Sequence, residues 1–200
     1  MRSLTSTPLV AVAVTLLATL LLAFSSVDRT ALEACSAPAT HQPVAKATPA
    51  FSTERVAADV LWLARAIYSE TKRPHEQALV AWTIRNRVET NYRGRDSYES
   101  VVLDPWQYSA FNTNSPKRHY YTTLAATSTA RGFETALRVA YEVYYADASE
   151  RPFDATTRHF YSERSMEGGE IPAWAVGQQP VQLADYNVDP RRFRFYAAIA

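Results

Sequence analysis

The longest apolar run of the chain lies close to its first residue. No residue from Ser3 to Val27 is charged, and Leu9 to Phe24 are nearly all Leu, Val or Ala, with Arg2 in front of them. Sixteen helical residues span about 24 Å, slightly less than the roughly 30 Å hydrocarbon core of a membrane. The pattern fits a cleaved signal peptide and an uncleaved membrane anchor about equally well. We therefore predict that residues 1–27 direct export to the periplasm or cell-wall space, in secreted or membrane-anchored form.

A change of composition follows this run. Residues 28–50 are rich in Ala, Thr and Pro, with prolines at positions 38, 43 and 49. Such a segment buries too little apolar surface to offset the entropy lost on ordering it. We predict a linker over 28–50 and a single folded domain over 51–200, which is long enough to enclose one hydrophobic core.

Apolar residues at three- and four-residue spacing predict two helices at the start of this domain. The first is expected to begin at a cap on Thr53 and to end near Glu70. Its apolar positions are Val56, Val60, Leu63, Ala64 and Ile67. Pro74 breaks this helix and suits the first turn of a second helix, which we expect over 74–88.

The rest of the domain changes from helical to strand patterns. A short helix capped by Ser97 is expected to reach Leu103, and residues 112–118 have the composition of a loop. An apolar stripe predicts a long helix over 132–147. Residues 157–162 and 192–197 are typical of short strands, with glycines and prolines between them. The fold class predicted is therefore α+β, a helix-rich single domain with a small late β-sheet.

Composition and charge narrow the classes of function. The chain is 47% hydrophobic and 20% charged with a net charge of +1, which excludes a wholly disordered protein. The part after position 50 carries 18 basic and 18 acidic residues, so it lacks the broad basic field that nucleic-acid binding usually needs. A single cysteine, Cys35, excludes an intramolecular disulfide and a zinc site built from cysteines.

Glu70 is the residue whose position points most directly to chemistry. A carboxylate at the end of a helix faces the negative end of the helix dipole, and the neighbouring Tyr68 offers partly dry surroundings. Both effects raise the pKa of a carboxyl, as a general acid for glycoside cleavage requires. The alternative interpretation is a solvated glutamate at a helix end, which is the commoner situation.

Other chemical signatures are weak in this sequence. His75, His119 and His159 lie far apart and form no tight ligand spacing, so we predict no metal site. The chain has no GxSxG elbow, phosphate-binding loop or GxGxxG turn. The arginines at 191, 192 and 194 are interpreted as surface charge on a terminal strand.

Several segments, in register over most of 60–196, resemble the SleB-type cell-wall hydrolases, the family named after a spore cortex-lytic enzyme. The segments are Leu63–Glu70, Gln77–Val88, Val101–Leu103 with Gln107–Ser109, His159–Tyr161, Pro172–Ala175 and Phe193–Tyr196. The chain departs from the family pattern after Glu70, where the segment up to Gln77 is about two residues shorter. Glu76 takes the place of the second acidic position of the family only in part.

The resemblance implies a lysozyme-like or lytic-transglycosylase-like fold behind the predicted signal or anchor helix. It also implies cleavage of peptidoglycan glycan strands between N-acetylmuramic acid and N-acetylglucosamine. Glu70 would act as the single catalytic acid and base and yield 1,6-anhydro-muramoyl products, with no cofactor. A hydrolase would normally need a second carboxylate, which no motif position supplies.

The substrate-binding residues that we expect offer either hydrogen bonds to sugar substituents or aromatic faces. They are Tyr68, Asn86, Gln107, Tyr108, Ser109, His159, Tyr161 and Trp174. For Asn86 a buried structural role is an equal alternative, and the aromatic residues are more often core than cleft.

Two alternative functions stay open, a zinc-dependent amidase or peptidase acting on the stem peptides and a non-catalytic wall-binding module. The expected partners are the glycan strands, the membrane if residues 1–27 are retained, and no nucleic acid; the sequence leaves open an activating protein.

Overall fold

The computed structural model describes residues 48–186 and 188–199, which belong to one compact unit. The predicted leader (1–27) and most of the predicted linker lie outside the described residues. Within the described part of the chain, no helix is long and apolar enough to cross a membrane.

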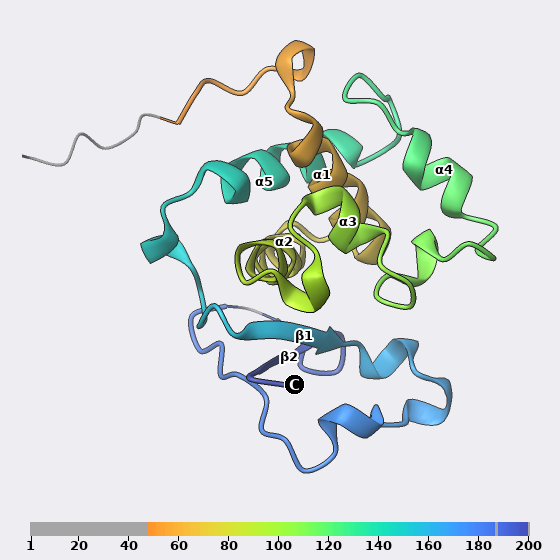
Figure 1. Cartoon of the computed structure of the whole chain (residues 1–200), viewed down its shortest axis with the longest axis vertical. Coiled ribbons are helices and arrows are strands. Elements are labelled where there is room, and N and C mark those ends of the chain that lie inside the picture. The colour runs from red at the N-terminus through yellow and green to blue at the C-terminus, as the bar shows by residue number, and fades with distance from the viewer. Residues whose placement is uncertain (1–47, 187, 200) are drawn as a thin grey trace, which may run out of the picture. The chain divides into compact units, whose positions relative to one another are not determined.

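Three long helices build the core. They are α1 (Ala58–Glu70), α2 (Pro74–Glu89) and α5 (Phe133–Tyr145), and α1 packs against both of the others and against the short helix α3 (Tyr98–Val102) (Figure 1). The side chains at their centre are completely buried and mostly branched aliphatic, as the apolar spacing predicted. They include Val60, Leu63, Ile67, Leu79, Ile84 and Leu137.

The beginning of α1 differs from the prediction. Ser52, not Thr53, acts as a cap, because its hydroxyl accepts a hydrogen bond from the backbone N–H of Glu54 at 3.3 Å. This cap starts only the 3₁₀ turn η1 (Thr53–Arg55), and Val56 is extended, so the apolar stripe is interrupted. The helix α1 begins later, after Ala57, which provides no side-chain cap.

The starts of the next two helices agree with the sequence. Pro74 occupies the first turn of α2, and Ser97 caps α3 in a reciprocal capping box with Ser100. A further helix, α4 (Arg118–Thr123), was not predicted and begins at the end of the expected loop. The described residues also contain the 3₁₀ helices η2 (Tyr92–Gly94), η3 (Ser109–Phe111), η4 (Ala148–Glu150), η5 (Glu163–Ser165), η6 (Glu167–Gly169) and η7 (Ala173–Ala175).

Two short antiparallel strands follow the helices. Strand β1 (Thr157–Tyr161) pairs with β2 (Arg194–Ala197), and the register is irregular between Thr157 and His159. Figure 1 shows this sheet beneath α2, which contacts β1, with the segment that contains η6 and η7 below the sheet. The predicted α+β class, helix-rich with a small late sheet, is therefore confirmed.

Candidate functional site

Glu70 is the last residue of α1, and its surroundings favour the protonated carboxyl. The residue is half-buried, and desolvation of its carboxyl is the largest influence on its pKa. Burial raises the pKa of Glu70 from 4.5 to about 7, while the positive charge of Arg87 and hydrogen bonding by the Ser69 side chain act in the opposite direction. At neutral pH a large fraction of this carboxyl therefore holds a proton that it can donate.

A hollow of about 230 Å³ lies beside the end of α1. It is lined by Ser69, Ser109, Ala110, Ser115, Pro116, Lys117 and Tyr121, and so contains three hydroxyl-bearing serines and no acidic side chain. Tyr121 links this hollow to Glu70: burial is the main cause that raises the pKa of Tyr121, and the charges of Tyr120 and Glu70 add to it. The candidate acid is thus close to an open, polar surface that can accept a hydroxyl-rich ligand.

The turn that follows Glu70 is fixed by the buried carboxylate of Glu76, for which the sequence predicted no structural role. Glu76 is 2% exposed and accepts a hydrogen bond from the Thr71 hydroxyl at 2.6 Å. The Arg192 guanidinium binds both of its oxygens, Nε to Oε1 at 2.7 Å and Nη2 to Oε2 at 3.0 Å. Burial alone would raise the pKa of Glu76, but the bonds from Arg192 and Thr71 outweigh it and lower the pKa. Glu76 is therefore an ionised structural group.

Gln77 completes this turn. Its side-chain amide donates to the backbone oxygen of Thr71 at 2.9 Å, and the residue is almost completely buried. Two consecutive residues of α2 thus hold Thr71, the residue directly after Glu70. The position of the candidate acid depends on these contacts, since Thr71 ends α1.

Tyr68 is close to Glu70 in sequence, but its ring is not open to a ligand. The residue is 5% exposed, and its hydroxyl donates to the backbone oxygen of Arg131 at 3.0 Å. The ammonium nitrogen of Lys72 lies 3.1 Å from the centre of the Tyr68 ring and covers it. Tyr68 is therefore a core residue and does not offer a stacking surface.

Arg87, on α2, connects the surroundings of Glu70 with the sheet. It is buried, donates from Nε to the backbone oxygen of Arg158 at 2.7 Å, and donates from Nη1 to the hydroxyl of Tyr108 at 3.0 Å. Tyr108 is 1% exposed, so the predicted stacking of this ring on a sugar does not fit the fold. Its neighbours differ: Ser109 is exposed at the hollow, and Gln107 is half-buried beside Arg87.

Asn86 has the structural role that the sequence left as an alternative. Its amide nitrogen donates to the backbone oxygens of Asp154 at 3.2 Å and Thr157 at 2.9 Å, and the residue is completely buried. These two bonds fasten the beginning of β1 to α2, and the oxygen of Asp154 also accepts a hydrogen bond from the backbone N–H of Thr157 at 2.9 Å.

The remaining predicted residues gather in the sheet. Tyr161 is buried and stacks on Tyr196 at 5.9 Å between ring centres, and Trp174 stands edge-on to both rings. Nε2 of His159 lies 3.0 Å from the hydroxyl of Tyr92. Burial, with the charges of nearby arginines, lowers the pKa of His159 to about 4, so this imidazole is neutral at physiological pH. These side chains form an aromatic cluster of the sheet.

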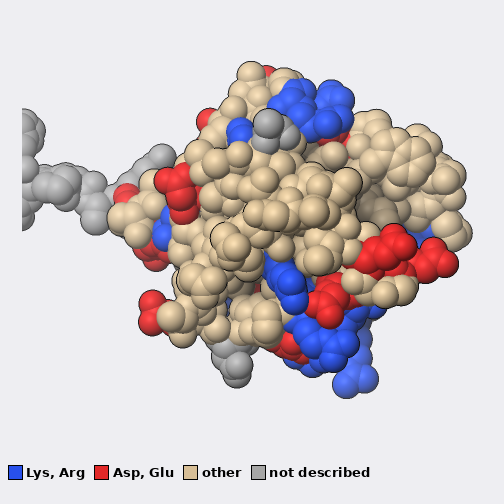
Figure 2. All heavy atoms as spheres, turned by 90° about the horizontal axis from the view of Figure 1, so that it is seen from below, with Lys and Arg blue, Asp and Glu red and all other residues tan. Residues whose placement is uncertain are grey.

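The terminal arginines are held in ion pairs. Arg191 lies 3.5 Å and Arg194 2.7 Å from the carboxylate of Glu163, and Arg192 binds Glu76 as described above. Figure 2 shows basic and acidic side chains next to one another on the face seen from below. The arrangement agrees with the expected surface charge for two of the three arginines and gives Arg192 a structural role.

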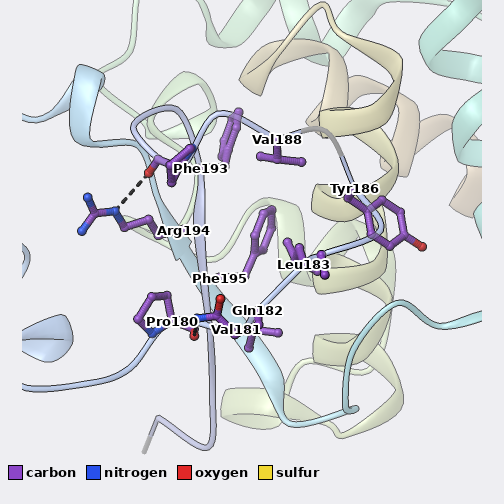
Figure 3. Close-up of a pocket in the computed structure, with 11 residues that line it drawn as sticks. Pro180, Val181, Gln182, Leu183, Tyr186, Val188, Phe193, Arg194 and Phe195 are labelled. Carbon is purple, nitrogen blue, oxygen red and sulfur yellow. Dashed lines mark hydrogen bonds between the residues drawn. The ribbon is translucent and has the colours of Figure 1, made fainter.

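A larger hollow, of about 320 Å³, is formed by residues 180–195 (Figure 3). Its wall contains Val181, Leu183, Phe193 and Phe195 and no acidic side chain, and Arg194 there donates to the backbone oxygen of Pro190 at 3.0 Å. None of the predicted site residues lines this hollow. Among residues 48–186 and 188–199 no group of three His, Cys, Asp or Glu side chains is placed to hold a metal ion.

Comparison of the chain with protein-family models, with curated proteins and with solved structures finds no match in any of the three.

Proposed function

We propose that this protein cleaves the glycan strands of peptidoglycan between N-acetylmuramic acid and N-acetylglucosamine, with Glu70 as the single catalytic acid and base. The observation that carries the proposal is the half-buried Glu70 at the end of α1, with its pKa raised to about 7, next in sequence to Ser69, which lines a polar hollow that has no acidic side chain in its wall. The resemblance of residues 60–196 to SleB-type hydrolases gives independent support from the sequence.

The chemistry follows from one carboxyl. Protonated Glu70 donates its proton to the glycosidic oxygen as the bond from that oxygen to C1 of the muramoyl residue breaks. The resulting carboxylate takes the proton of the 6-hydroxyl of the same muramoyl residue, whose oxygen closes on C1. The products are a 1,6-anhydro sugar and a free 4-hydroxyl, no water is consumed, and Glu70 regains its proton.

The wall of the hollow has no acidic side chain that could serve as the second carboxyl of a hydrolase, which favours the transglycosylase route. Hydrolytic glycosidases pair two carboxyl groups roughly 5–10 Å apart, one of them to activate water or to attack C1. The carboxylate nearest to Glu70 in the following turn, Glu76, is engaged by Arg192 and has a lowered pKa, so it is bound and ionised.

The test is digestion of purified sacculi by the full chain and by Glu70→Gln, with the soluble products weighed by mass spectrometry. Glu134→Gln is a matched control, because Glu134 is an exposed glutamate on α5 that pairs only with Arg138, at 3.5 Å. We expect anhydro-muramoyl products from wild type and from Glu134→Gln, and a rate lower by at least about 10²-fold in Glu70→Gln.

Other products would contradict parts of the proposal. Reducing ends would indicate a hydrolase, and freed stem peptides would indicate an amidase or peptidase. Products unchanged in Glu70→Gln would exclude Glu70 as the acid, and binding to sacculi without any soluble product would favour a wall-binding module.

A further inference from the structure

Trp106 is an exposed tryptophan on a strained backbone. The residue is 77% exposed, which makes it the most exposed large hydrophobic side chain of the described residues. Its φ angle is +67°, in the left-handed region that bulky L residues rarely adopt. The strain is held in place by Asn112, whose side-chain oxygen accepts a hydrogen bond from the backbone N–H of Trp106 at 2.9 Å. A large ring presented to solvent at a conformational cost indicates a functional position.

A third hollow, of about 130 Å³, lies at this tryptophan. Its wall combines aromatic and apolar surface with an amide, a hydroxyl and a guanidinium group. The residues are Leu103, Pro105, Trp106, Phe111, Asn112, Thr113 and Arg118. The amide nitrogen of Asn112 makes no hydrogen bond to any of the described residues, so it is free to donate to a ligand. An apolar ring face beside hydrogen-bonding groups matches a sugar, which has one apolar face and hydroxyls at its edge.

The hollow at Trp106 and the hollow beside Glu70 are lined by neighbouring residues of the same two segments of the chain. Ser109 and Ala110 line the hollow at Glu70, and the next residues along the chain, Phe111 to Thr113, line the hollow at Trp106. Further along the chain, Lys117 lines the hollow beside Glu70 and Arg118 lines the hollow at Trp106. The Arg118 guanidinium donates to the backbone oxygen of Phe111, so η3 and α4, which contribute residues to both hollows, are fastened together.

We propose that Trp106 stacks on a sugar ring of the glycan strand that is bound at Glu70, outside the two sugars that flank the cleaved bond. Asn112 would donate to a hydroxyl or acetamido oxygen of the same ring. This inference rests on the proposed function for the identity of the polymer. It assigns the stacking role to a residue different from Tyr108 and Tyr161, whose rings are buried.

The variant Trp106→Gly removes the ring and relieves the backbone, because glycine adopts a positive φ readily. Binding of an N-acetylglucosamine tetramer is measured by titration calorimetry with the full chain carrying Glu70→Gln, so that no turnover interferes. We expect the dissociation constant to rise about tenfold in Trp106→Gly, which is typical of the loss of one aromatic anchor. Trp106→Tyr keeps an aromatic face and is expected to recover most of the affinity. Val176→Ala, at an exposed apolar residue of another segment, is the control and is expected to bind like the parent.

Kinetics on isolated glycan strands provide a second measurement. Trp106→Gly in an otherwise wild-type chain is expected to raise KM about tenfold for long strands and to leave kcat unchanged, because the ring lies outside the cleaved bond. Unchanged affinity and KM in Trp106→Gly would overturn the inference and leave the proposed function standing. If the tetramer binds Trp106-dependently while sacculi yield no products, the sugar site stands and the proposed catalysis fails. A change confined to self-association would mean that Trp106 contacts a second copy of the chain, and the inference would fail.

Discussion

Replacing Glu70 by Gln is expected to stabilise the fold at alkaline pH while it abolishes the proposed activity. Burial raises the pKa of Glu70 from 4.5 to about 7, against the opposing effects of Arg87 and Ser69. A carboxyl whose pKa is raised in the folded state contributes most to stability when it is protonated, below about pH 4.5. That contribution is lost as the pH rises through 7, because the charged form must then be accommodated in a desolvated position.

The magnitude follows from the two pKa values. At about 1.4 kcal/mol per pKa unit, the difference between 4.5 and about 7 corresponds to about 3 kcal/mol of lost stability once the carboxyl is ionised. Because Glu70 is only half-buried, solvent screening reduces this figure, and we expect about 1–2 kcal/mol. Glutamine does not ionise, so the variant avoids the loss. For a domain of about 150 residues this is an increase in Tm of roughly 2–8 °C at pH 8.5.

The assay is thermal unfolding followed by circular dichroism at several pH values from 4 to 8.5. Wild type, Glu70→Gln and the exposed control Glu134→Gln are compared in the same buffers. The Tm of Glu70→Gln relative to wild type should increase as the pH rises through 7, and that of Glu134→Gln should not. A Tm difference that is constant from pH 4 to 8.5, or that appears equally in the control, would refute the assignment of a raised pKa to Glu70.

Four further outcomes are expected. Arg192→Met should lower the free energy of unfolding, measured in urea, by about 3 kcal/mol, since the Glu76 carboxylate is then buried without its partner. Because the pKa of Glu76 is lowered in the folded state, the contribution of this pair is present above about pH 4.5 and lost on acidification. An Arg192→Met variant as stable as wild type would contradict this role. Asn86→Ala should cost about 2 kcal/mol and accelerate hydrogen exchange in β1, and unchanged exchange there would count against the two bonds as its anchor. Arg87→Met should move the alkaline limb of the kcat/KM profile to higher pH, because the Arg87 charge lowers the pKa of Glu70, and a shift to lower pH would reverse the argument. Trp106→Gly should keep or raise Tm, with a gain of up to about 1 kcal/mol in the free energy of unfolding, because glycine adopts the positive φ at position 106 without strain. A marked fall in Tm would show that the indole supports the fold.

The parts of the fold that the sequence predicts well are those with a clear local cause. Helix α5 has an apolar stripe at helical spacing, and α2 has Pro74 in its first turn. The start of α1 was misplaced because Ser52 and Thr53 are both good caps, and the extended Val56 separates them from the helix. Helix α4 was missed because its sequence, RHYYTT, has no buried residue and no apolar stripe, so periodicity gives no signal.

The candidate site shows the same division between local and distant causes. The position of Glu70 at a helix end could be predicted, because the break before Pro74 is local. The burial of Tyr68 could not, and that of Asn86 could be given only as one of two alternatives, since their partners are backbone groups more than 60 residues away. The exposure of Trp106 depends on a backbone conformation that its own residue type disfavours, so no propensity could predict it.

The ion pair between Glu76 and Arg192 also determines the order in which parts of the domain can fold during synthesis. A ribosome makes Arg192 a full 116 residues after Glu76, which at about 5–20 residues per second is a delay of roughly 6–23 seconds. During that interval the helices α1 and α2 can form, but burying the Glu76 carboxylate without its guanidinium is unfavourable. The turn that holds Glu70 therefore closes late, after the strand β2 region has been released. A partly synthesised chain would carry the proposed acid without the geometry that places it, so that activity is withheld until that region has emerged and folded.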